Sequence, residues 1–242
     1  MADLRDFYEK EAENTRRYDS QSFWDSRYHK KRKKHVLTLL KSFPHANMFL
    51  DIGCGTGEYV AEASRFSTEA IGLDVSKKYL KGIKKLNVRT QLIQADARAL
   101  PLKGKCAECV LCSETIEHLP NPSAVIDEIS RVAKATIVIS TPNYGILRTL
   151  LSRISKKSVN NLDESVGHVH VFFFNELQEL VMDKCNITSE TVLHVMPPII
   201  GESLHIPPKL ALFVDILEKS MEKLFPTTGN ISIIVCQPSK PL

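Results

Sequence analysis

The chain has 242 residues, of which 43% are hydrophobic and 25% are charged, and its formal net charge is +4. This length and composition suit one α/β domain with some additions around a single buried core. The net charge is too small to imply nucleic-acid binding by itself, and no apolar run of the sequence approaches the roughly 20 residues of a membrane span. The acidic, polar amino-terminal segment does not resemble a secretory signal, so we expect a cytoplasmic protein.

Residues 1–43 read as two helical segments, which we expect to form an amino-terminal helical cap on a domain of residues 44–242. The second segment holds a basic run at residues 27–35, beside Phe23 and Trp24. Such a run can contact RNA or an anionic membrane surface. It is also typical of a solvated helix face, and that is the interpretation we favour.

The segment from Phe49 to Val60 is the most informative part of the chain, because an apolar run is followed by Gly53, Gly55 and Gly57. Glycines at alternate positions permit positive φ angles and let another group approach the backbone closely. The helix that follows would point its amino-terminal amides at that group. We therefore expect a strand that turns sharply into a helix around a nucleotide-like cofactor, with the carboxylate of Asp51 beside it.

Polar residues also close the next three predicted strands of an alternating strand and helix pattern over residues 48–141. The second strand ends at Asp74, the third leads into Asp96, and the fourth ends at Ser113. In an open α/β sheet, ligands lie outside the carboxyl ends of the strands. These side chains should therefore meet at one edge.

Together, these motifs resemble the class I S-adenosylmethionine-dependent methyltransferases, closely over residues 45–145 and loosely elsewhere. The resemblance implies a Rossmann-like, doubly wound, seven-stranded and mostly parallel sheet with an antiparallel last strand and helices on both faces. It also implies that Asp51 and the glycine turn hold the methionine moiety, that Asp74 binds the ribose hydroxyls, and that Asp96 accepts a hydrogen bond from the adenine amino group. The full cofactor-binding set is Asp51, Gly53, Cys54, Gly55, Gly57, Asp74, Val75, Asp96, Ala97 and Ser113.

Beyond this region we expect helices at residues 123–132, 175–185 and 209–225, and strands at 136–140, near 193–196 and at 231–236. Residues 142–170 would form a substrate-side loop, and residues 197–228 a helical insertion before the antiparallel last strand. The insertion helix has an apolar stripe, for which core packing is the favoured explanation and a homodimer contact or a cap over an apolar substrate the alternative. The stripe consists of Leu210, Phe213, Val214, Leu217, Met221 and Leu224.

The exit of the fourth strand carries Glu114, Glu117 and His118, which would share a face on a helical turn. This pattern resembles the metal-binding segment of ubiquinone-pathway O-methyltransferases and of small-RNA terminal 2′-O-methyltransferases, in which His168 would supply a fourth ligand. A Mg²⁺ or Mn²⁺ ion there would lower the pKa of an acceptor hydroxyl. The same short motifs also occur in relatives without a metal, so we do not assign one and expect His118, His168 and Glu117 to act in acceptor orientation or base catalysis.

The acceptor is the least specified feature of the sequence. The fourth strand lacks the Asn/Asp-Pro-Pro-Tyr motif of adenine amino-methyltransferases, and a second basic stretch at residues 148–157 could attract an anionic acceptor. We expect methyl transfer to oxygen of a small-molecule or lipid-linked acceptor. A metal-assisted RNA 2′-O-methyltransferase and a non-catalytic cofactor-binding module remain the alternatives.

Overall fold

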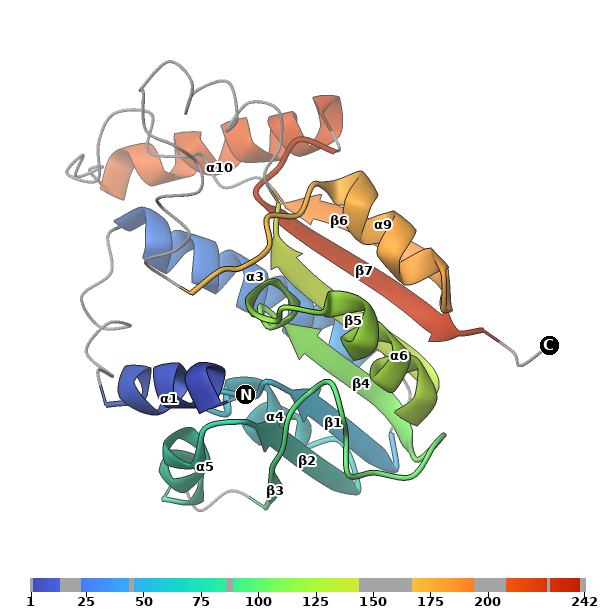
Figure 1. The fold of residues 1–242 in the computed structure, drawn as a ribbon. Helices are drawn as coiled ribbons and strands as arrows, with labels where there is room; N and C mark the ends of the chain where they lie inside the picture. Colours follow the sequence, from blue (N-terminus) through green and yellow to red (C-terminus); the bar gives the residue numbers. More distant parts are fainter. Residues whose placement is uncertain are drawn as a thin grey trace.

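The computed structural model describes residues 2–13, 23–43, 46–85, 89–143, 167–193, 208–225 and 227–239. Seven strands form one sheet in the order β3-β2-β1-β4-β5-β7-β6 (Figure 1). The strands are β1 (Met48–Ile52), β2 (Glu69–Asp74), β3 (Gln91–Gln94), β4 (Ala107–Ser113), β5 (Ala133–Pro142), β6 (Cys185–Leu193) and β7 (Ile231–Pro238). Neighbouring strands from β3 through β5 are parallel, whereas β7 runs antiparallel to both β5 and β6. The expected fold class is confirmed.

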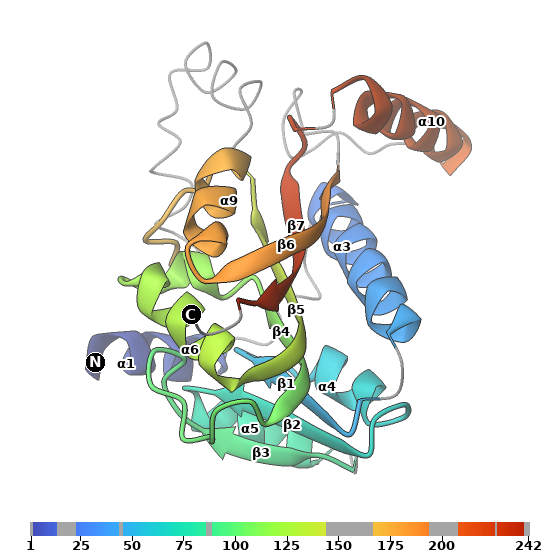
Figure 2. The ribbon, with the colours of Figure 1, turned by 90° about the vertical axis from the view of Figure 1, so that its right-hand side faces the viewer.

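Helices cover both faces of the sheet (Figure 2). One face carries α3 (Phe23–Ser42), α4 (Glu58–Ala63) and α5 (Lys77–Lys84), and the other carries α6 (Pro122–Val132) and α9 (Phe174–Met182). Because successive strand side chains point to opposite faces, Phe49 of β1 packs with the first group while Leu50 and Ile52 pack with the second. The apolar core therefore lies in two layers, with the sheet between them.

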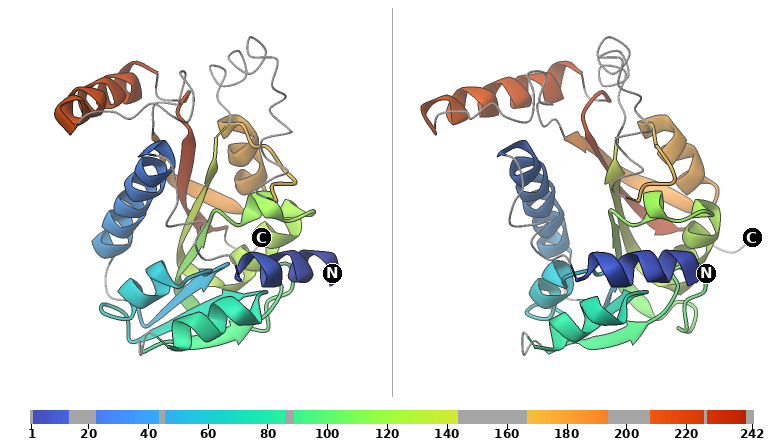
Figure 3. Two further views of the ribbon diagram at one scale, coloured as in Figure 1. Left: turned by 90° about the vertical axis from the view of Figure 1, so that its left-hand side faces the viewer. Right: turned by 60° about the vertical axis from the view of Figure 1, so that its left-hand side comes forward.

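The segment expected to form an amino-terminal cap divides into two helices with different surroundings. Val36 and Leu40 of α3 are buried in the core beside α4. The shorter helix α1 (Ala2–Glu11) instead lies beside α5, as Figure 3 shows, and the backbone amide of Lys77 donates to the carboxylate of Glu9. Thus, of these two helices, α3 packs against the sheet, whereas α1 packs beside α5.

The sixth strand begins earlier than the sequence indicated. β6 begins at Cys185, where the expected helix was to end, and it closes at Leu193, the first residue of the segment expected in or near this strand. The middle of this edge strand is mostly exposed, and a register shift lies between Ile187 and Ser189, which weakens the alternation that identifies a strand in sequence. Residues 194–196 lie outside the described part of the chain.

The insertion helix is α10 (Pro208–Leu224), close to its expected position. Most of the expected substrate-side loop of residues 142–170, including the second basic stretch, lies outside the described residues. Cys54, Cys109 and Cys112 are buried and form no disulfide. Among the helices of the described ranges, none is long and apolar enough to cross a membrane.

Candidate active site

The glycine turn after β1 is built for close packing on two sides and for open space on the third. All three glycines have positive φ angles, of 72° at Gly53, 48° at Gly55 and 83° at Gly57. A Cβ atom would lie 2.2 Å from Thr115 Oγ1 if built on Gly53 and 2.6 Å from Ile83 Cγ1 if built on Gly57, whereas one on Gly55 would meet nothing within 4 Å. The turn therefore keeps open space at Gly55, at the carboxyl end of β1.

Asp51 is the second-last residue of β1, at the strand end next to this space, and its carboxyl group is buried. Its side chain is 1% exposed, and Oδ2 has no hydrogen-bond partner among the described residues. Burial raises the pKa of Asp51 to about 8, although the backbone amide of Val60 acts in the opposite direction. A buried, unpartnered carboxylate oxygen is costly unless a ligand pairs with it, and a cationic amino group would do so.

Asp74, at the end of β2, fixes the shape of the turn. Its Oδ2 accepts from the Gly55 amide and its Oδ1 accepts from the Ser76 amide, each at 2.8 Å. Burial raises the pKa of Asp74, while these amides oppose the shift. Each oxygen keeps a second lone pair, so the carboxylate could still accept from a pair of hydroxyl groups. Next to it, the carbonyl of Val75 accepts from Gln94 Nε2 at 3.0 Å.

Asp96 follows β3 and is already paired with Arg98. Arg98 Nη2 lies 2.7 Å from Asp96 Oδ2, and this hydrogen-bonded pair lowers the pKa of the carboxyl group. Ala97, beside it, is buried, as is Cys54 in the glycine turn. The hydroxyl groups of Ser113 and Ser140 lie 2.7 Å apart at the ends of β4 and β5. All predicted cofactor residues thus belong to the glycine turn or to the ends of β1–β4 and the turns that follow.

Glu114 departs from the expected arrangement. Only residues Ile116–His118 form the 3₁₀ turn η1, and Glu114 lies before it with a positive φ of 51°. Its carboxylate accepts from the Tyr28 hydroxyl at 3.0 Å and lies 2.6 Å from Arg32 Nη1, both on α3. Glu114 therefore does not share one helical face with Glu117 and His118, because its backbone conformation and its partners on α3 place it apart.

Glu117, His118 and His168 do come together, with one potential ligand atom of each within 4.8 Å of the others. Glu117 is buried, its Oε2 accepts from the Thr141 hydroxyl at 3.1 Å, and Oε1 has no hydrogen-bond partner among the described residues. Burial, reinforced by Glu114, raises the pKa of Glu117 well above its usual range.

His118 is held in one orientation. Its Nδ1 lies 3.0 Å from the Gly167 carbonyl oxygen, to which it can only donate, so the proton of the neutral ring is on Nδ1. Burial, together with His168, lowers the pKa of His118 to about 4, so the imidazole is neutral near pH 7. Nε2 therefore carries a lone pair that can accept a proton or bind a metal ion.

Three aromatic or basic groups complete this site and were not assigned from the sequence. Tyr8 of α1 packs edge-on against His118, with ring centroids 5.7 Å apart. Tyr28 and Arg32 of α3 reach Glu114 across the sheet edge. The spacing of Tyr28 and Arg32, four residues apart on a helix, places them on one face, and this was the available signal. Nothing in the sequence near Tyr8 indicates its position.

The basic run of α3 is largely used within the molecule. Arg27 and Lys31 pair with acidic groups of α10, Arg32 pairs with Glu114, and Lys33 pairs with Glu58. Of the run's Lys and Arg residues, Lys30 and Lys34 are exposed. The favoured interpretation of a solvated face is therefore wrong for Arg27, Lys31 and Arg32, which are largely buried against α10 or Glu114.

The strand order, the glycine turn and the carboxyl groups that follow β1, β2 and β3 define a class I S-adenosylmethionine-dependent methyltransferase domain. Residues 50–138 match the sequence family described as a methyltransferase domain.

Two curated relatives match different shares of the chain. It is 31% identical over 111 residues to the ubiquinone biosynthesis O-methyltransferase of Methylococcus capsulatus, covering 43% of this chain and 46% of that enzyme. The chain thus spans about half the length of that relative. It is 26% identical over 245 residues to the uncharacterized protein MJ0638 of Methanocaldococcus jannaschii, covering 97% of this chain and 98% of that protein.

Solved structures share the fold over nearly the whole chain. A chain of the complex between the Haloferax volcanii Trm112 methyltransferase activator and a methyltransferase aligns with a TM-score of 0.68 and 15% identity, covering 99% of both chains. The N-methyltransferase NodS of Bradyrhizobium japonicum, solved with S-adenosyl-L-homocysteine, aligns with a TM-score of 0.64 and 11% identity, covering 98% of this chain and 99% of NodS. At these identities the likeness concerns the fold.

Proposed function

We propose that this chain transfers the methyl group of S-adenosylmethionine to an oxygen atom of a small-molecule or lipid-linked acceptor. The observation that carries the choice of oxygen is the state of His118, a neutral imidazole whose proton is fixed on Nδ1 by the Gly167 carbonyl. Its free Nε2 belongs to the same carboxyl edge of the sheet as Asp51 and Gly55. A hydroxyl acceptor needs such a base more than an amine does, because it must lose its proton as the methyl bond forms.

The cofactor would be held by the strand ends of β1, β2 and β3. Asp51 would pair with the cationic amino group of the methionine moiety, because its buried Oδ2 has no other partner among the described residues. The open space at Gly55 would admit the ligand against the backbone. Asp74 would accept from the ribose hydroxyls, and Asp96 would use a lone pair left by Arg98 for the adenine amino group.

Bound S-adenosylmethionine supplies a methyl carbon activated by the adjacent sulfonium, so the chain's own contribution is alignment, exclusion of water and removal of one proton. His118 Nε2 would take the proton of the acceptor hydroxyl, and Gly167 would keep the ring oriented during that transfer. Tyr8 would cover the imidazole from α1. Tyr28 and Arg32 would hold the Glu114 carboxylate away from the His118 ring, and Arg32 would compensate the charge of that carboxylate.

A divalent metal ion is a second candidate for the same cluster, favoured by the proximity of Glu117, His118 and His168. Two nitrogen donors and one oxygen donor suit a Mn²⁺ or Zn²⁺ ion better than Mg²⁺, which prefers oxygen ligands. Glu114 would not be a ligand in this arrangement. The name of the Methylococcus relative, an O-methyltransferase, supports the oxygen acceptor in either version.

The test is calorimetric titration of the full chain with S-adenosylmethionine and S-adenosylhomocysteine, with and without Mn²⁺ and after chelation. We expect micromolar binding of both, followed by transfer of a labelled methyl group to phenolic or catecholic hydroxyls in preference to matched amines. If the folded protein bound neither S-adenosylmethionine nor S-adenosylhomocysteine, the proposed methyltransferase activity would be refuted. If chelation abolished methylation, the group that activates the acceptor hydroxyl would be a metal ion and not His118.

The same assays separate the remaining alternatives. Preference for the terminal 2′-hydroxyl of an RNA oligonucleotide would favour the RNA 2′-O-methyltransferase, for which the internally paired basic run of α3 gives little support. Cofactor binding with no transfer to hydroxyl, amine or RNA acceptors would indicate a non-catalytic module. An activator partner, as for the methyltransferase in the Trm112 complex, would be tested by adding such a protein to an inactive preparation.

A further inference from the structure

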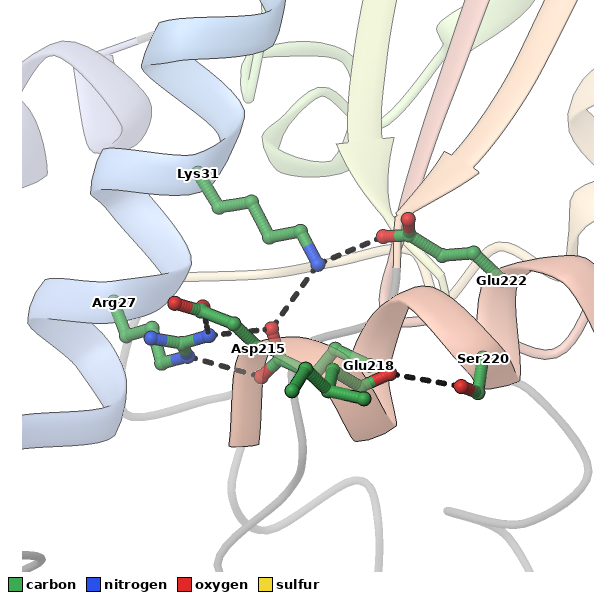
Figure 4. Close-up of polar contacts among 7 residues, drawn as sticks. Arg27, Lys31, Asp215, Glu218, Ser220 and Glu222 are labelled. Atoms are coloured by element: carbon green, nitrogen blue, oxygen red, sulfur yellow. Dashed lines mark hydrogen bonds and ion pairs between the residues drawn. The ribbon is translucent and has the colours of Figure 1, made fainter. Parts of the chain in front are cut away.

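Helix α10 turns its acidic side inward, towards α3, as Figure 4 shows. Glu218 is fully buried there and accepts from Arg27 Nε at 3.0 Å, from Arg27 Nη2 at 2.8 Å and from Lys31 at 3.1 Å. Lys31 also lies 2.7 Å from Glu222, and Arg27 pairs with Asp215. The acids on this side of α10 are thus compensated by two cations from a helix nearly two hundred residues away in sequence.

The opposite side of α10 is apolar and basic, which is the reverse of an ordinary surface helix. Its apolar side chains are Leu212, Phe213, Ile216 and Leu224, exposed by 69%, 58%, 54% and 70%. Lys219 and Lys223 are also exposed, and they follow Ile216 by three and seven residues, which places them on the same side. We call these six residues the outer face of α10. It contradicts the expectation that Phe213 and Leu224 pack in the core.

We propose that the outer face of α10 binds the surface of an anionic lipid bilayer. Apolar side chains with lysines on one face are the features of a helix that lies in a membrane interface. The acid at the edge of this face, Asp215, is paired with Arg27 of α3. The lysines would meet anionic headgroups while the Leu, Ile and Phe side chains enter the boundary with the acyl chains. The inward-facing acids favour this, because Arg27 and Lys31 compensate their charge at the side away from the lipid.

A second copy of the chain fits the outer face less well. A two-fold contact through it would place the same patch against itself, and so would bring Lys219 and Lys223 of both copies together. The acids of α10 that could pair with them are on the inner side or already paired with α3. Like charges at such a contact are unfavourable, whereas anionic headgroups complement them.

The position of α10 links such a surface to the candidate active site. The turn that follows α10 is tied to the carboxyl end of β5, because Asn143 Nδ2 donates to the Thr227 carbonyl at 3.2 Å and to the Gly229 carbonyl at 2.6 Å. Ligands of this fold lie at that edge of the sheet. A bilayer bound by α10 would therefore lie next to the acceptor side of the site. That membrane binding serves catalysis rests on the proposed function, in which the acceptor is lipid-linked.

The test is co-sedimentation of the full chain with vesicles of phosphatidylcholine alone and of phosphatidylcholine with phosphatidylglycerol. We expect sedimentation with the anionic vesicles that weakens as salt is added. The double variants Phe213→Asp with Ile216→Asp, and Lys219→Glu with Lys223→Glu, should each lower the partition coefficient at least about tenfold. Met182→Asp, which puts an acid at an exposed apolar site on α9, is the matched control and should sediment like the wild type.

Binding of S-adenosylhomocysteine by each variant checks that it is folded and separates this inference from the proposed function. If wild type binds anionic vesicles but not the cofactor, the proposed function fails and the lipid surface stands. Failure to bind anionic vesicles, or equal loss in the Met182→Asp control, overturns the lipid proposal. So does a wild-type dimer in sedimentation equilibrium that becomes monomeric on changing Phe213 and Ile216 while vesicle binding is absent.

Discussion

The proposed cofactor side and the proposed acceptor side of the carboxyl edge are built from different kinds of contact. On the cofactor side, the Gly55 amide and the Asp74 carboxylate are 19 residues apart, and Arg98 and Asp96 are two apart. On the acceptor side, His118 and Gly167 are 49 residues apart, and Tyr28 and Glu114 are 86 apart. The first side consists of successive strand-turn-helix units, whereas the second is assembled from distant segments.

The two sides also differ in how their buried acids are compensated. Asp51 keeps an oxygen without a partner among the described residues, while Glu114 is paired with Tyr28 and Arg32. An unpartnered buried carboxyl group costs more stability than a paired one until a ligand arrives. Substitutions on the cofactor side should therefore separate stability from binding, and substitutions on the acceptor side should separate binding from turnover.

The largest effect is expected on the acceptor side. His118→Asn should lower turnover about 10²- to 10⁴-fold, because it removes the base while leaving cofactor contacts intact. The affinity for S-adenosylhomocysteine, measured by calorimetry, should stay within about twofold.

His170→Asn is the matched control, since His170 Nε2 lies 3.3 Å from the Pro120 carbonyl and His170 is not part of the Glu117–His118–His168 cluster. It should change turnover little. An unchanged turnover in His118→Asn would show that His118 is not the base, and an equal loss in both variants would point to a structural cause.

Asp51→Asn tests the cofactor side and should act in opposite directions on binding and stability. Cofactor affinity should fall about 10- to 150-fold, the equivalent of about 1.5–3 kcal/mol for a hydrogen bond to a charged group. The ligand-free variant should nevertheless melt at a higher temperature than wild type at pH 8.

The sign of the stability effect follows from the pKa of Asp51. Burial raises it to about 8, so the folded chain holds a proton that the unfolded chain releases. This group's contribution to stability is full below the unfolded pKa of about 4 and is lost as pH rises towards 8. The advantage of Asp51→Asn in melting temperature should therefore shrink towards pH 4. Asp183→Asn, at an exposed site, should show neither effect.

The cofactor side could be predicted from the sequence because each of its residues is adjacent to a strand end. Asp51, Asp74 and Asp96 each follow an apolar run, and the glycine spacing describes its own turn. Their positions needed no knowledge of distant contacts. The presence of strands β1 to β5 followed from the same alternation of strands and helices.

The contacts that α1 and α3 make on the proposed acceptor side could not be predicted, because these helices are distant in sequence from Glu114 and His118. The helical spacing of α10 indicated an apolar stripe but not which way it faces, and Phe213 is exposed while Glu218 is buried. Glu114 was placed on a helical face with Glu117 by spacing alone, yet its φ of 51° is set by its position before η1 and its contacts with α3. Local patterns do not carry this information.

Two glycine substitutions sharpen the comparison within the cofactor turn. Gly57→Ala should destabilise the chain by about 2–4 kcal/mol, because its Cβ would lie 2.6 Å from Ile83 Cγ1 at a φ of 83°. Gly55→Ala should lose only about 1–2 kcal/mol from the positive φ, yet weaken cofactor binding, since its Cβ enters open space.

Chemical denaturation and calorimetry measure the two effects separately. Gly82→Ala, within α5 and with nothing near its Cβ, should be neutral or slightly stabilising. A Gly55→Ala variant that binds the cofactor with wild-type affinity would exclude the open space at Gly55 from the cofactor site.

The pH dependence of binding gives the smallest effect, about 1.4 kcal/mol per pH unit at most, but it tests both sides in one experiment. Below pH 8 the empty site holds a proton on Asp51 that must leave when a cationic amino group binds. The affinity for the cofactor should therefore rise by up to about tenfold for each unit by which the pH increases towards 8. Above the ordinary pKa of an α-amino group, about 8, the free ligand loses its own proton and affinity should fall. Binding should therefore be strongest near pH 8, and the acid limb should vanish in Asp51→Asn.

Turnover at saturating cofactor should behave differently over the same range. Burial and His168 hold the pKa of His118 at about 4, so the imidazole remains a free base down to the lowest pH that the fold tolerates. Turnover should then lack the acid limb that binding shows between pH 6 and 8. An acid limb in turnover within that window would mean that the proton is taken by a group other than His118, whereas flat binding would mean that Asp51 does not meet the amino group.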